Sequence, residues 1–189
     1  MNKRKLRNLE VNPIGLGCMG FSHGYGEIPS EEYSIQAIQK AQAVHPLSAI
    51  QNIYSMVERS CEEEVIPYCM EHNIALVPFS PIASGLLSGK VNTSTDFSHN
   101  DDVRKFVPQL KKENLEANQP LIQLIETYAK AKNATDAQIA LAWMLHKYPN
   151  VVPIPGSKNQ ERILENLAAW DVILTDEEFN DLDKALEQL

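Results

Sequence analysis

The sequence has no long apolar run and no basic stripe, and each absence excludes a class of protein. Its apolar runs fall short of the roughly 18 residues that a membrane span needs, so we expect no membrane partner. A net charge of −8 argues against a nucleic-acid surface, which requires clustered cations. The basic cluster at Lys3–Arg7 precedes no apolar segment, so it predicts the start of a hairpin rather than a targeting signal.

Metal-binding and nucleophilic motifs are also missing. The three cysteines, Cys18, Cys61 and Cys69, are odd in number and lack zinc-ligand spacing, which predicts reduced thiols in a cytoplasmic protein. The five histidines form no H-E-x-x-H or H-x-x-E-H group, so we expect no metal site. No Ser-His-Asp or Cys-His pattern stands out, and the sequence assigns no catalytic nucleophile.

Strand-like and helix-like segments alternate along the chain and predict an α/β fold. The 189 residues, 43% of them apolar, suffice for one well-cored domain. Strands are expected at 49–52 and 75–79, and a hairpin at 3–12 with its turn near 7–8. Helices are expected at 30–43, 62–72, 120–132 and 136–147, with a last helix capped by Thr175 and Glu178. The polar stretch 90–118 exceeds a usual connection and predicts a lid or binding loop.

The stretch Val151–Asn166, VVPIPGSKNQERILEN, is the most informative part of the chain. Its first residues form a compact apolar run, which predicts a parallel strand covered on both faces. A Pro-Gly-Ser turn ends that strand, and Asn159 can cap the helix that follows. Ser157, Lys158 and Arg162 then gather at a helix N-terminus, where free N–H groups and the dipole favour an anion. Ordinary capping with two solvated cations explains these residues equally well.

The order of residues in IPGSKNQERILEN resembles the last strand–turn–helix of the aldo-keto reductases, and IGLGCMGFSHGYG resembles their first strand in a bacterial-type branch. These proteins are (β/α)8 TIM barrels that reduce carbonyl groups of aldehydes and ketones with NADPH. QNIYS and SPIASGLLSGK extend the likeness to the sixth and seventh strands. The resemblance therefore implies NADPH as cofactor and a small carbonyl compound as substrate.

The resemblance also implies the cofactor contacts. Gln51 would hydrogen-bond the nicotinamide carboxamide, Phe79 would stack on its ring, and Met19 would lie nearby. The loop with Ser80, Pro81, Ile82 and Ser84 would cross the pyrophosphate. The turn and helix would hold the adenosine end and its 2′-phosphate through Gly156, Ser157, Lys158, Arg162, Glu165 and Asn166.

Part of the family pattern is missing. A complete barrel takes about 250 residues, and this chain contains neither the F-D-T-A…Y-G segment nor the later strands that deliver the family's catalytic Asp, Tyr, Lys and His. Tyr25-Gly26 precedes the first helix, so we do not assign it the acid role. We predict a single truncated domain over 1–189, with the first strand and helix in 1–41 and the sixth to eighth βα units in 42–189. The junction lies near 41–43, within a hybrid helix.

Three functions remain open from the sequence. One is an NADPH-dependent oxidoreductase with residual activity or none, because the catalytic set is missing. The second is a non-catalytic NADP(H)-binding or interaction remnant. A third, a phosphate-binding module unrelated to redox chemistry, leaves Gln51 and Phe79 unexplained. A half barrel exposes strand edges, so we also expect self-association through those edges.

Overall fold

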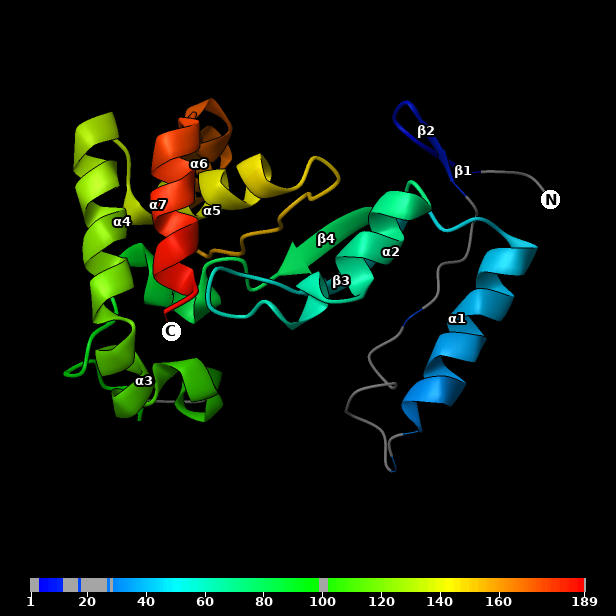
Figure 1. Cartoon of the computed structure of the whole chain (residues 1–189), viewed down its shortest axis with the longest axis horizontal. Coiled ribbons are helices and arrows are strands. Elements are labelled where there is room, and N and C mark those ends of the chain that lie inside the picture. The colour runs from blue at the N-terminus through cyan, green and yellow to red at the C-terminus, as the bar shows by residue number, and fades with distance from the viewer. Residues whose placement is uncertain (1–3, 12–16, 18–26, 28, 99–101, 189) are drawn as a thin grey trace. The chain divides into compact units, whose positions relative to one another are not determined.

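The computed structural model describes residues 4–11, 17, 27, 29–98 and 102–188. The chain divides into two compact units, Met1–Leu47 and Ser48–Leu189 (Figure 1). Among the described helices, none is long and apolar enough to cross a membrane. Within the same residues, no group of three or more His, Cys, Asp or Glu side chains is placed to hold a metal ion.

The first unit contains the predicted hairpin and the predicted first helix. Strands β1 (Arg4–Leu6) and β2 (Leu9–Val11) pair antiparallel, and Arg7 has a positive φ of 53° in the turn between them. Helix α1 (Glu31–Val44) begins where Ser30 Oγ accepts the N–H of Tyr33 at 3.3 Å. The first-strand segment around Met19 lies outside the described residues, and the predicted junction at 41–43 falls inside α1.

The second unit is built on two parallel strands, β3 (Ala49–Ile53) and β4 (Ala75–Phe79), with Gln51 opposite Val77. The predicted helix between them is divided into the 3-10 turn η2 (Ser60–Glu62) and helix α2 (Val65–Glu71). Pro67 explains the late start of α2, because proline lacks an N–H and is tolerated only in the first turn of a helix.

The segment after Asn150 continues this sheet. Val151 bridges in parallel to Leu76, the Val152 N–H donates to the Leu76 carbonyl at 2.8 Å, and the Ile154 N–H donates to the Pro78 carbonyl at 3.0 Å. The second unit therefore holds three parallel extended segments with intervening helices, as a partial (β/α)8 barrel requires.

The expectation that this segment is covered on both faces was wrong. Val151 is buried, but Val152 and Ile154 are 55% and 45% exposed. Side chains alternate between the two faces of a sheet, and in the described structure one face of these strands carries the buried residues Leu76 and Val151. Among the described residues of this unit, no comparable cover lies on the other face.

The helices of the second unit enclose its core. Helices α4 (Gln119–Lys132), α5 (Asp136–Lys147) and α7 (Asp176–Leu186) pack together in Figure 1, around the fully buried Trp143. The predicted capping boxes are confirmed at Thr135 with Gln138 and at Thr175 with Glu178. The remaining elements are η3 (Ala83–Ser88), η4 (Val103–Phe106), η5 (Pro108–Leu110), α3 (Lys112–Ala117), α6 (Gln160–Leu167) and η6 (Ala168–Asp171).

Cys61 and Cys69 are buried free thiols, and we expect both to be unreactive in the native chain. Burial, with a smaller contribution from Glu62, raises the pKa of Cys61 to about 11, and burial also raises the pKa of Cys69. In a Cys18→Ser variant, a disulfide reagent at neutral pH should react at least about 100-fold more slowly than in denaturant, because the thiolate is the reactive species. Equal rates in the two solvents would contradict this prediction.

Candidate functional site

A groove of about 470 Å³ opens where β4 ends and the segment after Val151 turns into α6. Four parts of the second unit contribute to it: the loop after β4, the long loop before α3, the start of α5, and the turn with α6. Its lining residues are Ser80, Pro81, Ile82, Ser84, Gly85, Ser88, Lys90, Arg104, Ala137, Ile154, Gly156, Ser157, Arg162, Glu165 and Asn166.

In the loop after β4, several non-glycine residues have an uncommon backbone conformation. Ser80, Ala83 and Ser84 have positive φ values of 54°, 47° and 55°, which few residues other than glycine adopt. Short hydrogen bonds close these turns: the Ala83 N–H donates to the Ser80 carbonyl at 2.9 Å, and the Ser88 hydroxyl donates to the Gly85 carbonyl at 2.6 Å. Strained conformations of this kind cluster at ligand-binding sites, so the loop is a candidate binding element.

The turn before α6 and the start of that helix also line the groove. The predicted cap is present, because the Arg162 N–H donates to Asn159 Oδ1 at 2.9 Å and the Asn159 N–H donates to Ser157 Oγ at 3.1 Å. Gln138 on α5 donates to the Glu165 carbonyl at 2.9 Å and so ties the two helices together. These bonds hold the turn and the helix start in one fixed arrangement.

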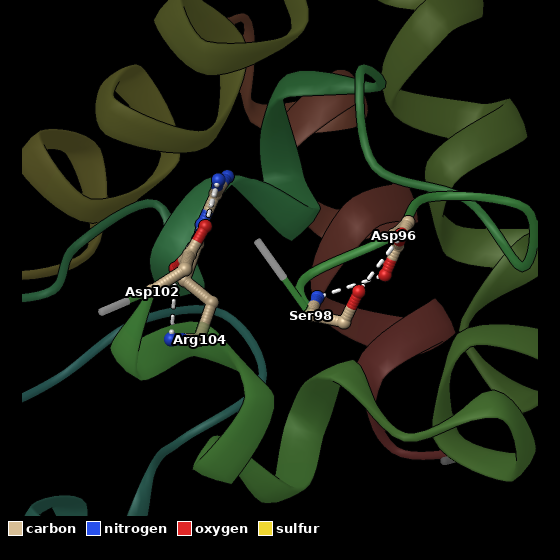
Figure 2. A network of polar contacts seen from close by, with 4 residues as sticks. All are labelled: Asp96, Ser98, Asp102 and Arg104. Atoms are coloured by element: carbon tan, nitrogen blue, oxygen red, sulfur yellow. Dashed lines mark hydrogen bonds and ion pairs between the residues drawn. The ribbon is translucent and has the colours of Figure 1, made fainter. Parts of the chain in front are cut away.

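The long loop before α3 contributes Arg104 to the lining of the groove. Its guanidinium forms an ion pair with Asp102 through Nε and Nη2, as Figure 2 shows, and lies 4.8 Å from the centre of the Phe97 ring. The hydrogen bonds from Arg104 lower the pKa of Asp102 to about 2, so Asp102 is ionised at neutral pH. Nearby, Ser98 donates from its N–H and hydroxyl to Asp96 (Figure 2).

The groove carries a small excess of positive charge. Lys90, Arg104 and Arg162 line it together with Glu165, and Asp102 forms an ion pair with Arg104. Cations from three separate segments that converge on one concavity favour a ligand with several negative charges. A phosphate ester meets that condition.

The groove brings together most of the residues that the sequence predicted for cofactor binding. They are Ser80, Pro81, Ile82, Ser84, Gly156, Ser157, Arg162, Glu165 and Asn166. Lys158 is exposed and does not line the groove, and neither do Gln51 and Phe79. Gln51 is exposed on β3, and Phe79 is 41% exposed at the end of β4. Met19 lies outside the described residues.

Six lining residues were not predicted from the sequence: Gly85, Ser88, Lys90, Arg104, Ala137 and Ile154. Three of them belong to the run SPIASGLLSGK, where the spacing of Ser88 and Lys90 after Ser80 offered a signal. Arg104 belongs to the predicted lid loop, but nothing local to it distinguishes it from other loop cations. Ala137 is a helix residue whose place beside the groove depends on packing alone.

Comparisons with known proteins identify relatives of this chain. The model of the aldo/keto reductase family matches residues 28–187. A probable aldo-keto reductase 1 from Glycine max is 37% identical over 158 residues, which cover 82% of this chain and 44% of that protein.

Solved structures agree with this match. The glycerol dehydrogenase AKR11B4 from Gluconobacter oxydans superposes with a TM-score of 0.72 and 27% identity, covering 85% of this chain and 47% of that one. An aldo/keto reductase from Klebsiella pneumoniae in complex with NADP and acetate gives a TM-score of 0.56 and 25% identity, covering 82% and 45%. The chain thus spans less than half the length of these relatives.

Proposed function

The chain belongs to the aldo/keto reductase family, and from this premise we propose that its groove binds NADPH. The observation that carries the proposal is the convergence of the loop after β4 and the turn at Gly156–Arg162 on one cationic concavity. A volume of about 470 Å³ lies within the range of small-molecule sites. Solved relatives from Klebsiella pneumoniae hold NADP or NADPH.

On this proposal, different lining residues contact different parts of the cofactor. Arg162 and the hydroxyl of Ser157 sit at the N-terminus of α6, where a phosphate monoester is favoured, so they take the 2′-phosphate. The strained loop at Ser80–Ser84 and the cations Lys90 and Arg104 hold the pyrophosphate. Bound NADPH supplies a hydride from its nicotinamide, while this chain's own groups hold and orient the nucleotide.

Gln51 and Phe79 would contact the nicotinamide from the open face of the sheet. Gln51 lies opposite Val77 and Ile53 lies opposite Phe79, so both side chains project from the face that also carries Val152 and Ile154. On this proposal, the nicotinamide would lie beyond the end of the groove, beside β3 and β4.

We further propose that the chain by itself reduces carbonyl compounds weakly or not at all. The described residues do contain a Tyr, a Lys and two carboxylates in contact, namely Tyr54, Lys147, Glu62 and Asp183. They cannot replace the family's acid, because Tyr54 is fully buried and does not line the groove. Burial and the bond to Glu62 raise the pKa of Tyr54, whereas a proton donor at neutral pH needs a lowered value.

Calorimetric titration with NADPH, NADP⁺ and NADH tests the proposal, with an aldehyde-reduction assay alongside. We expect saturable binding of both 2′-phosphorylated cofactors, at least about tenfold tighter than NADH, because a charge-assisted contact to Arg162 is worth 1.5–3 kcal/mol. Equal affinity for NADPH and NADH, or no binding at millimolar cofactor, would contradict the cofactor assignment. Steady aldehyde turnover would contradict only the proposed weakness of catalysis and would favour the oxidoreductase reading.

A further inference from the structure

The Arg104 side chain is held on two sides by residues of the long loop before α3. Its Nε donates to both carboxylate oxygens of Asp102, at 2.9 and 3.0 Å, and its Nη2 donates to Asp102 Oδ2 (Figure 2). The Cζ of Arg104 lies over the Phe97 ring, 4.8 Å from the ring centre. One edge and one face of the planar guanidinium are therefore occupied, which fixes its orientation.

The second edge of the Arg104 guanidinium remains available to a ligand. Asp102 takes the Nε–H and one N–H of Nη2, whereas both N–H groups of Nη1 and the other N–H of Nη2 form the opposite edge. No residue in the described part of the chain accepts from that edge. Arg104 also lines the groove, and its side chain is 43% exposed. Its free edge can therefore bind a phosphate group through two parallel hydrogen bonds.

We propose that Asp102 is a positioning residue, which holds Arg104 so that its free edge meets the pyrophosphate of the cofactor. This inference rests on the cofactor site proposed above. A long arginine side chain loses rotamer freedom when it binds a ligand, and ordering it beforehand removes part of that cost. The formal charges of the two residues cancel, so the pair contributes direction rather than net attraction to the site.

The charge of Asp102 by itself predicts the opposite effect on binding. A carboxylate close to a phosphate repels it, so removal of that charge alone would tighten cofactor binding. Asp102→Asn is the suitable variant, because its amide oxygen can still accept the Arg104 backbone N–H, which Asp102 Oδ1 accepts at 3.0 Å at the start of η4. The variant therefore keeps the cap of η4 and loses the charged contact to the guanidinium.

Calorimetric titration of the parent chain, Asp102→Asn, Arg104→Gln and the double variant tests the proposal. Asp102→Asn should weaken the binding of NADPH and NADH alike by about 3–10-fold, since both cofactors carry the pyrophosphate. Arg104→Gln should weaken it at least about tenfold. In the Arg104→Gln background, Asp102→Asn should leave the affinity unchanged or raise it, because only the repulsion is then lost.

The sign of the change separates this role from two others. Weaker binding in both backgrounds would mean that Asp102 only supports the fold of the loop, and tighter binding in both would make it a repulsive charge near the site. Asp96→Asn is the matched control, because it removes the same charge from the same loop, where Asp96 accepts from the N–H and hydroxyl of Ser98 (Figure 2). It should not weaken binding. Either uniform result, or an equal loss in Asp96→Asn, would overturn the proposal.

The order of the Arg104 side chain can be measured without any cofactor. In NMR spectra of the ligand-free chain, the Arg104 Nε–H should be ordered in the parent and mobile in Asp102→Asn. Equal mobility in the two chains would overturn the proposal. Failure of the parent to bind NADPH would overturn the cofactor site and this inference with it, whereas NADPH binding with the wrong sign in the double-variant comparison would overturn the inference alone.

Discussion

Replacing Lys147 by Met should lower the free energy of unfolding by about 2–4 kcal/mol, the largest stability effect we expect from replacing one charged residue. Lys147 Nζ lies 2.7 Å from Asp183 Oδ1 and 3.3 Å from Glu62 Oε1, and its side chain is only 13% exposed. The same Glu62 oxygen accepts the Tyr54 hydroxyl at 2.6 Å. Removal of the ammonium leaves two carboxylates close together without their shared cation.

Because of its position, the loss of Lys147 should destabilise the whole second unit. Glu62 belongs to η2, Asp183 to α7, and Lys147 is the last residue of α5. The ammonium also lies 4.8 Å from the centre of the Trp143 ring, in the middle of the core. One side chain therefore links three elements that are far apart in the chain.

Thermal and urea unfolding of Lys147→Met would measure this effect, with Lys184→Met as control. Lys184 is an exposed lysine of α7, so its variant should change stability by less than about 0.5 kcal/mol. At roughly 2–4 °C per kcal/mol, Lys147→Met should lower Tm by about 5–15 °C. A triple variant that adds Glu62→Gln and Asp183→Asn should recover part of the loss, since it removes the stranded charges. A Tm equal to that of Lys184→Met would refute the prediction.

The second large effect concerns NADPH binding by Arg162 and Lys158, two cations that the sequence predicted to contact the same phosphate. Arg162→Ala should weaken NADPH binding by about 30–150-fold, which corresponds to 2–3 kcal/mol for a charge-assisted contact to phosphate. Lys158→Ala should weaken it less than about threefold, because Lys158 is exposed and lies off the groove. Both variants lose one positive charge, so general attraction changes equally and position alone decides the difference.

The same titrations with NADH sharpen this comparison. If Arg162 holds the 2′-phosphate, Arg162→Ala should bring the NADPH and NADH affinities close together, while NADH binding changes little. Equal losses for Arg162→Ala and Lys158→Ala would show that overall charge, and not the turn before α6, controls cofactor affinity. An equal loss for both cofactors in Arg162→Ala would place Arg162 on the pyrophosphate instead.

Local features of this protein could be predicted because short-range contacts determine them. A hydroxyl or amide three residues before a backbone N–H is enough to start a helix, which explains why the caps at Ser30, Thr135, Asn159 and Thr175 were foreseen. The turn at Arg7–Asn8 and the bounds of β4 follow in the same way. The order Gly156-Ser157-Lys158 before Arg162 likewise pointed to an anion site and to the family.

Whether a strand face is covered, and which side chains share the groove, depends on contacts between residues far apart in the chain. Only the tertiary structure could therefore show them. An apolar run such as Val151–Ile154 reads the same whether one face or both are covered, and only the packed unit shows Val152 and Ile154 exposed. Arg104 lines the groove together with residues of the loop after β4 and of the turn before α6, from which it is distant in the sequence.

The residue types thus specified by themselves most of the helices and strands, the family and the turn that we propose binds phosphate. The fold decided which cations share the groove and that Lys147 joins η2, α5 and α7. The physical reason is that capping and turn formation act within a few residues, whereas burial and charge pairing act between whole elements.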